Sequence, residues 1–288
     1  MEIVQLVTLA VVQGITEFLP ISSSGHLVLT SRVLGWADQG LVIDVAVHVG
    51  TLLAVVVYFW RDIWKMIAGT AGIVTGRRDP GFRLAMHVVI ATIPIVAAGY
   101  FIQPYIGSTF RSVELIGWTT LGFGVLLGVA DWLCMTLRRI EHLNVPTAFF
   151  VGVAQVLALL PGTSRSGITM TACRFMGMER GEAARFSLLM SIPAIMGAAT
   201  IAGLGLYKSG DVALGFDAAL AALFAFGTAL ISIAAMMQWL MRATFTPFVI
   251  YRVLLGGLLL CWVYGWLGLD EVRLAVTSAA AIDVQIGR

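Results

Sequence analysis

Charged residues are scarce in this sequence. Asp, Glu, Lys and Arg make up 12% of its 288 residues, about half of their usual share in soluble domains. Hydrophobic residues make up 59%, an excess that a soluble core does not explain. We therefore expect an integral membrane protein. The formal net charge of +2 says little about partners, and we expect no nucleic acid among them.

Cysteine is rare as well. The three cysteines, Cys134, Cys173 and Cys261, lie far apart in apolar stretches, and no Cys-x-x-Cys or Cys/His spacing occurs. This pattern suggests neither a disulfide framework nor a zinc site. We expect all three cysteines to be small buried residues.

Long apolar runs, in contrast, are abundant. A membrane-spanning helix needs about 20 mostly apolar residues. Charged residues, glycine and proline separate the runs, for instance in WRDIWK at 60–65. The sequence therefore predicts an all-α polytopic membrane protein with six transmembrane helices. The six stretches lie at roughly 42–60, 84–103, 113–137, 186–206, 212–240 and 247–268.

Two further apolar segments, 3–19 and 145–160, are interrupted. Each runs into a proline and a Ser/Gly cluster, and then into a second apolar piece at about 26–35 or 167–177. At about 1.5 Å per residue the second pieces are too short to cross a bilayer. We expect two re-entrant helix-loop-helix segments, whose broken backbone must be buried in protein or line a wet cavity. Helices lying at the surface, and an eight-span arrangement in which both segments cross, remain alternatives.

The two interrupted segments resemble each other. Residues 13–25 (QGITEFLPISSSG) and 155–167 (QVLALLPGTSRSG) both contain glutamine, an apolar stretch, proline, a serine-rich run and glycine. The positions that match at a spacing of 142 residues are Gln13 and Gln155, Ser22 and Ser164, Ser24 and Ser166, and Gly25 and Gly167.

This likeness predicts an inverted repeat. If each half has one re-entrant segment and three spans, the odd number of crossings turns the second half upside down. We expect the repeats at 1–140 and 141–270 of a single membrane domain, followed by a polar tail at 271–288. Eleven Lys and Arg residues then fall on one side of the membrane and five on the other. The positive-inside rule makes the first side cytoplasmic, so both termini and the first re-entrant loop face outward.

The densest polar runs follow the two proline breaks. Ser22, Ser23 and Ser24 stand just before a predicted helix, where free backbone N–H groups and the positive helix end favour an anion, especially phosphate. The run GTSRSG at 162–167 repeats this arrangement and adds Arg165, whose planar guanidinium matches phosphate oxygens. We therefore expect a phosphate-binding site. Its candidate residues are Ser22, Ser24, Gly25, Thr163, Ser164 and Ser166.

Titratable groups beside these serines suggest catalysis. Gln13 and Glu17 are four residues apart on one helix face, and Ser23 and His26 are three apart. A hydroxyl nucleophile, a histidine for proton transfer and Arg165 for developing negative charge form a phosphoryl-transfer set. Two roles stay open for Glu17. It either holds, with Gln13 beside it, a Mg²⁺ or Ca²⁺ ion that bridges phosphate oxygens, or it orients His26.

Simpler interpretations exist for the same residues. Serines after a proline are commonly helix caps, and Arg165 could be a structural partner of Glu17. We expect His48 and Asp44 to be structural helix residues, and Arg252 to be either structural or in contact with a headgroup. The conjunction of a glutamate, a histidine and an arginine within a membrane is costly, and this favours function.

At these residues the sequence resembles a known family. QGITEFLPISSSGHL and LPGTSRSG are similar to the two signature motifs of the undecaprenyl pyrophosphate phosphatases of the bacitracin-resistance type. The likeness continues through DVAVHVGTLLAVVVYF, FSLLMSIPAIMGA and FVIYR, up to about residue 270. The family's first acidic position is Gln13 here, which weakens a metal site made of two carboxylates. The essential residues that the resemblance implies are Glu17, Ser23, His26 and Arg165.

The resemblance implies a bacterial inner-membrane enzyme that hydrolyses undecaprenyl diphosphate to undecaprenyl phosphate and inorganic phosphate, recycling the lipid carrier for peptidoglycan synthesis. It implies six spans and two re-entrant hairpins in inverted repeats, and dependence on a divalent cation. We expect the active site to open toward the periplasm. The expected partners are the lipid substrate and membrane lipid; a homodimer stays open, and so does the choice of Ser23 or His26 as nucleophile.

A transporter or flippase with the same phosphate cradle is the alternative function, because inverted repeats with broken helices are also a transporter architecture. A pure carrier needs the cradle but no nucleophile, so Ser23 with His26 favours the enzyme. A structural membrane subunit would leave Glu17, His26 and Arg165 unexplained.

Overall fold

The computed structural model describes residues 2–36, 40–72, 79–102, 112–134, 136–209 and 212–266. In these ranges the chain is helical, and its only extended pairing is an isolated bridge between Arg138 and Met178. The helices are α1 (Ile3–Thr16), α2 (Ser23–Val33), α3 (Gly40–Tyr58), α4 (Trp60–Ala71), α5 (Pro80–Ile102), α6 (Val113–Leu133), η4 (Ile140–His142), α7 (Val145–Gln155), η5 (Val156–Leu159), α8 (Arg165–Phe175), α9 (Arg180–Ser209), α10 (Val212–Leu240) and α11 (Thr246–Val263).

Several of these helices can cross a membrane. Four are long and apolar enough on their own, namely α5, α6, α10 and α11. The helices α3 and α4 meet the same criterion together, but they are bent by 79° relative to each other. Helix α9 covers the stretch at 186–206 that the sequence predicted as a span. The prediction of an all-helical, multi-pass membrane protein is confirmed.

Helix α4 is a feature that the sequence analysis missed. The run WRDIWK was interpreted as a break between spans because it carries three charges. In the structure it forms the first half of α4, after Phe59 interrupts the helix. Its apolar and charged residues alternate with the period of a helix, and this places them on different faces.

Both interrupted segments form a short helix, a break and a second short helix. Helix α1 ends just before Glu17, and α7 with η5 ends at Leu159. The bounds of α2 and α8 are 142 residues apart at both ends, the spacing that also separates the motifs. At each break the serine before the second helix has a left-handed backbone, with φ of 77° at Ser22 and 68° at Ser164. Because this conformation is costly for serine, the breaks share a strained geometry as well as a sequence.

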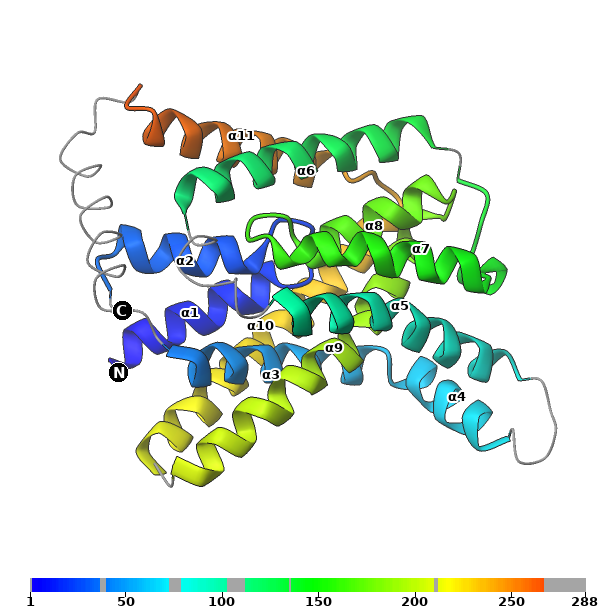
Figure 1. The fold of residues 1–288 in the computed structure, drawn as a ribbon, viewed down its shortest axis with the longest axis horizontal. Coiled ribbons are helices and arrows are strands. Elements are labelled where there is room, and N and C mark those ends of the chain that lie inside the picture. The colour runs from blue at the N-terminus through cyan, green and yellow to red at the C-terminus, as the bar shows by residue number, and fades with distance from the viewer. Residues whose placement is uncertain are drawn as a thin grey trace.

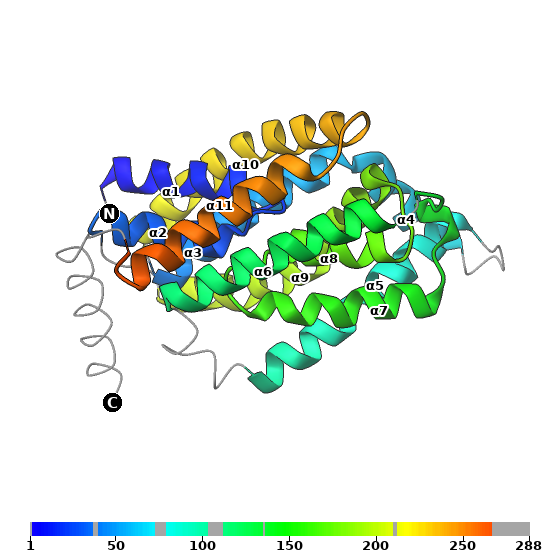
Figure 2. The ribbon, with the colours of Figure 1, turned by 90° about the horizontal axis from the view of Figure 1, so that it is seen from above.

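Helices from the two halves of the chain pack against each other. Helix α1 packs against α10, and α7 packs against α5; α3 lies along both α9 and α10. Helix α6 lies alongside α11 in both views of the bundle (Figures 1 and 2). Glycine permits two of these approaches, since a methyl group at Gly50 would collide with the Ala222 carbonyl and one at Gly152 with the Ala91 carbonyl.

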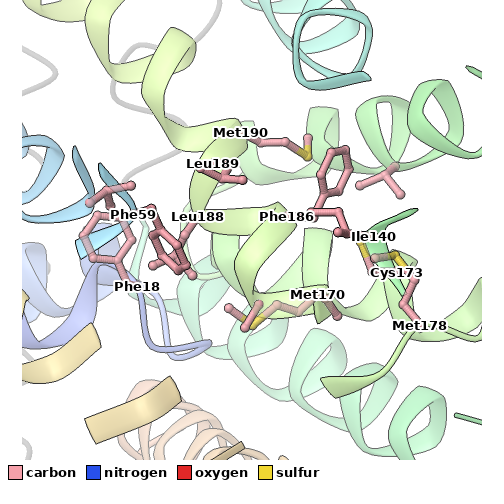
Figure 3. Packing of buried hydrophobic residues seen from close by; sticks show 14 of the residues in the cluster. Phe18, Phe59, Ile140, Met170, Cys173, Met178, Phe186, Leu188, Leu189 and Met190 are labelled. Carbon is pink, nitrogen blue, oxygen red and sulfur yellow. The ribbon is translucent and has the colours of Figure 1, made fainter. Parts of the chain in front are cut away.

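The main hydrophobic cluster anchors the first break. Phe18, directly after Glu17, is 1% exposed and belongs to the same cluster as Phe59 and Leu188. Figure 3 shows these three side chains together. Because the Phe18 ring is held in the core, the backbone of Glu17 is held with it.

The cysteines are free thiols with different surroundings. Cys173 is fully buried in the main cluster, as expected. Cys134 and Cys261 are only partly buried, because they lie at or near the ends of α6 and α11.

Candidate active site

The carboxylate of Glu17 is the point where the two interrupted segments meet. Its Oε1 accepts a hydrogen bond from Arg165 Nη2 at 2.7 Å. Its Oε2 accepts one from Ser23 Oγ at 2.6 Å and another from Gln13 Nε2 at 2.9 Å. The structure therefore brings the motifs together around a buried carboxylate. The pairing of Glu17 with Arg165, considered above as a structural alternative, is present.

Local structure explains why these side chains converge. Gln13 lies one helical turn before Glu17 in α1, so both side chains project from one face. Ser23 and Arg165 are the first residues of α2 and α8. At the second break the Ser164 hydroxyl caps α8 by accepting a hydrogen bond from the Gly167 N–H at 3.1 Å.

His26 has partners that the sequence did not suggest. Its Nδ1 lies 2.6 Å from the Ser22 carbonyl oxygen, and its Nε2 lies 2.6 Å from Tyr251 Oη of α11. The Tyr251 ring is also stacked on the imidazole, with centroids 5.7 Å apart. Because a carbonyl oxygen only accepts, Nδ1 carries a proton, and in the neutral ring Nε2 accepts from the Tyr251 hydroxyl.

The predicted pairing of Ser23 with His26 is not among the hydrogen bonds of the described residues. The Ser23 hydroxyl donates to Glu17, and both nitrogens of His26 are engaged elsewhere. In this arrangement the group that accepts the hydrogen bond of the serine hydroxyl is a carboxylate. Tyr251 was missed by the sequence analysis, although FVIYR belongs to the stretches that resemble the family.

His48 of α3 is a second residue that the sequence analysis missed as part of the site. The expected helix hydrogen bond is there, since Nδ1 lies 2.6 Å from the Asp44 carbonyl oxygen. The other nitrogen, Nε2, lies 3.5 Å from Glu17 Oε2. Glu17 thus has Arg165 beside one oxygen and His48 beside the other. A histidine inside a membrane is energetically costly and therefore suggests a function. This argument was used for His26, and it holds for His48 as well.

The candidate phosphate-binding serines form two similar pairs. Ser22 Oγ lies 3.4 Å from Ser24 Oγ, and Ser164 Oγ lies 3.1 Å from Ser166 Oγ. The Ser166 hydroxyl also reaches the other segment, where it donates to the Leu19 carbonyl at 3.0 Å. Ser166 therefore joins the two breaks.

The other two candidates differ in their surroundings. Thr163 Oγ1 is fully buried and has no hydrogen-bond partner among the residues that the structure describes. Gly25 is buried, and a methyl group there would come within 3.3 Å of Ile116.

Arg252 of α11 holds the two breaks in place. Its side chain is fully buried. It donates to the carbonyl oxygens of Pro20 at 3.2 Å, Gly162 at 3.1 Å and Thr120 at 3.1 Å. Pro20 and Gly162 are residues of the two breaks, where helix interruption frees backbone carbonyls. Of the two interpretations of Arg252, the structure supports the structural one.

Few groups in the site could bind a divalent cation. Among the described residues, no three His, Cys, Asp or Glu side chains gather to hold a metal ion. The Oε1 atom of Gln13 is buried without a hydrogen-bond partner in the same part of the chain. One carboxylate and one unpaired amide oxygen suit an ion held mainly by substrate phosphates, as Mg²⁺ commonly is, and not a cage made by protein alone. Gln155 Oε1 is also unpaired, so the unpaired oxygen does not define the site by itself.

Together, fold and site define a polytopic helical membrane protein in which two broken helices enclose a hydrogen-bonded serine, glutamate and arginine. The chain belongs to the family described as bacitracin resistance protein BacA, which matches residues 6–258. The resemblance inferred from the two motifs is thereby confirmed.

Curated relatives cover nearly the whole chain. It is 52% identical over 271 residues to undecaprenyl-diphosphatase 1 of Rhodospirillum rubrum, covering 92% of this chain and 96% of that protein. It is 49% identical over 266 residues to the undecaprenyl-diphosphatase of Jannaschia sp., covering 92% and 100% of the two chains. The undecaprenyl-diphosphatase of Hahella chejuensis is 49% identical over 261 residues, covering 90% and 98%.

Proposed function

We propose that this protein is an undecaprenyl-diphosphatase that releases inorganic phosphate from undecaprenyl diphosphate and recycles the lipid carrier for peptidoglycan synthesis. Its family and the names of its relatives support this activity. The observation that carries it is the hydrogen bond of 2.6 Å from Ser23 Oγ to Glu17 Oε2. A carrier for prenyl phosphates would have no use for a nucleophile bonded to a base, so the transporter is the less favoured function.

In the proposed reaction, Ser23 Oγ attacks the terminal phosphorus and Glu17 Oε2 takes the hydroxyl proton. An Oγ–P bond forms, the bridging P–O bond breaks, and undecaprenyl phosphate leaves. Arg165 is placed to neutralise the charge that develops on the phosphoryl oxygens, because its fork still has donors beyond the one that contacts Glu17. The hydroxyls of Ser22, Ser24, Ser164 and Thr163 would contact the diphosphate.

Hydrolysis of the phosphoserine completes the proposed cycle. Water attacks the phosphorus, the P–Oγ bond breaks, and Ser23 Oγ recovers a proton from Glu17. His26 is the base for this water, since its Nε2 has a lone pair in the tautomer that the Ser22 carbonyl fixes. The attacking water replaces the Tyr251 hydroxyl as the partner of Nε2, and the inorganic phosphate that leaves carries away the proton.

A divalent cation, Mg²⁺ or Ca²⁺, is part of this proposal. It would be carried by the diphosphate, with Glu17 and the amide oxygen of Gln13 as its protein ligands. When bound, it neutralises charge on the phosphate oxygens.

The finer topology is proposed as well: six spans and two re-entrant hairpins, arranged as inverted repeats at 1–140 and 141–270. The common spacing of α2 and α8, and the reciprocal packing of α1 on α10 and of α7 on α5, support it. The polar tail at 271–288 lies outside the described residues. We also propose that the protein lies in the bacterial inner membrane with its active site open toward the periplasm. The excess of cationic residues on one side supports this orientation.

Purified protein and undecaprenyl diphosphate provide the test. We expect release of inorganic phosphate that a chelator suppresses and added Mg²⁺ or Ca²⁺ restores. Movement of the lipid between leaflets of a proteoliposome, without phosphate release, would contradict the proposed activity and favour the transporter. For the orientation, single cysteines replacing Leu34 and Glu141 should react with an impermeant reagent from opposite sides of the membrane.

A further inference from the structure

A second polar region surrounds a cavity of about 400 Å³. The cavity lies between α4, the start of α5, η4 and the start of α9, and we refer to it as the α4–α5 cavity. None of the candidate active-site residues is among those lining it. Its charged and titratable lining residues are Asp62, Lys65, Arg83, His87, Glu141 and Arg185.

The cations of this cavity are only partly neutralised. Arg185 is hydrogen-bonded to Asp62 and lies 3.4 Å from Glu182. Lys65 and Arg83 are exposed and have no ion-pair partner among the residues that the structure describes. They come from different helices, α4 and the first turn of α5, and both line the same cavity. Two positive charges are therefore available to an anion, although the Glu141 carboxylate lines the same cavity.

His87 adds a hydrogen-bonding group to the two cations of this cavity. It is 4% exposed and lines the α4–α5 cavity from α5. Within the described ranges no hydrogen bond to its imidazole is found, and its ring nitrogens are not among the fully buried polar atoms that lack a partner, so they remain accessible. A ligand oxygen in the cavity would supply a partner.

Helix α4 places the cavity at the level of lipid headgroups. Trp60, Trp64 and Ile67 follow a spacing of four and three residues, so they share one face of α4. They are 58%, 65% and 57% exposed. The bend of 79° turns α4 away from the direction of α3. A helix with exposed tryptophans on one face and charged residues on another lies in the membrane interface. Lys65 of the same helix contributes to the cavity.

We propose that the α4–α5 cavity binds the headgroup phosphate of an anionic phospholipid. Lys65 and Arg83 attract the charge, and His87 donates a hydrogen bond to a phosphate oxygen. Basic pockets between membrane helices are known to suit acidic headgroups, and the cavity volume is within the range of small-molecule sites. The acyl chains would stay outside, along Trp60 and Trp64. This binding does not depend on the hydrolytic activity proposed above.

The test titrates the full-length protein in detergent with short-chain phosphatidylglycerol, with short-chain phosphatidylcholine and with inorganic phosphate. Thermal unfolding reports binding, because a ligand of the folded state raises Tm. We expect phosphatidylglycerol to raise Tm saturably and at lower concentration than the other two. In the double variant Lys65→Gln/Arg83→Gln its apparent Kd should rise about 25-fold, since each cation near an anionic lipid surface contributes roughly a factor of five.

Arg61→Gln is the matched control. Arg61 lies on the same helix, but its guanidinium is over the Trp60 ring and it does not line the cavity. Its removal should leave the affinity for phosphatidylglycerol unchanged. His87→Leu should weaken binding, while His87→Gln, which keeps a donor, should largely retain it. Equal weakening by Arg61→Gln, or equal binding of phosphatidylcholine, would overturn the proposal. So would inorganic phosphate that binds as tightly as phosphatidylglycerol, because that result identifies a site for free phosphate.

Discussion

The Ser23 hydroxyl lies 2.6 Å from Glu17 Oε2, across the break that separates α1 from α2. The carboxylate that receives this hydrogen bond also faces Arg165 and His48. The hydrogen bond from the Arg165 guanidinium favours the ionised form of this carboxylate, and an ionised carboxylate can accept a proton. In the proposed reaction the Ser23 proton therefore passes to Glu17, whereas the sequence had suggested His26.

Removal of the Ser23 hydroxyl or of the Glu17 carboxylate should therefore lower kcat by a similar factor. We expect Ser23→Ala and Glu17→Gln each to lower kcat by about 100-fold or more, the range of general acid–base catalysis. The double variant should lose little beyond the worse single variant, because residues that act as a unit are not additive. Steady-state kinetics of the three variants provide the measurement. Fully additive losses would mean that the two side chains act separately.

Substitution of Arg165 by lysine tests whether a planar guanidinium is needed. Lysine keeps the positive charge but loses the fork that contacts a carboxylate and a phosphate at the same time. Arg165→Lys should therefore remain strongly impaired, with kcat lowered by about 100-fold. Turnover close to that of the wild-type protein would show that Arg165 only attracts the substrate or only stabilises the fold.

Tyr251→Phe isolates the hydroxyl that contacts His26 Nε2. The aromatic stack remains in this variant, but the hydrogen bond of 2.6 Å is lost. We expect kcat to fall about tenfold with little change in KM, since His26 loses orientation and not substrate contact.

The control is Tyr264→Phe, which removes another tyrosine hydroxyl just after α11. Its hydroxyl donates to Glu114 at 2.7 Å, away from the site, and kcat should stay unchanged. A rise in KM alone for Tyr251→Phe would instead place Tyr251 in substrate binding.

Local physics explains which parts of the site were predictable. Gln13 and Glu17 lie one helical turn apart, and α2 and α8 begin where proline and serine predicted a helix start. Tyr251 and His48 reach the site from other helices, and no local pattern connects them with the motifs. Hydropathy identified long apolar helices because it averages over many residues, and α5, α6, α10 and α11 are each long and apolar enough to cross a membrane. The same averaging hid α4, whose charged residues lie on a different face of the helix from its exposed tryptophans.

The role of Arg252 could not be predicted from the sequence, for another reason. A buried guanidinium is satisfied only by acceptors, and those of Arg252 are carbonyls of both breaks and of α6. These carbonyls are close together only in the folded chain. The sequence therefore left two interpretations of Arg252, and the contacts of its buried side chain distinguish them.

The identity of the nucleophile is the last prediction. Ser23 is the first residue of α2, and its Oγ is bonded to a carboxylate that can take its proton. His26 Nε2 is engaged by the Tyr251 hydroxyl and is placed to act on water. We therefore expect a phosphoserine intermediate.

Rapid-quench experiments with substrate labelled in the terminal phosphate should trap an adduct that is stable to acid and labile to alkali. Ser23→Ala should abolish the adduct, and His26→Gln should make it accumulate because its hydrolysis is slowed. An acid-labile, alkali-stable adduct would identify phosphohistidine and reverse the two roles. Substantial turnover of Ser23→Ala without any adduct would mean that water attacks the diphosphate directly, with Glu17 as its base.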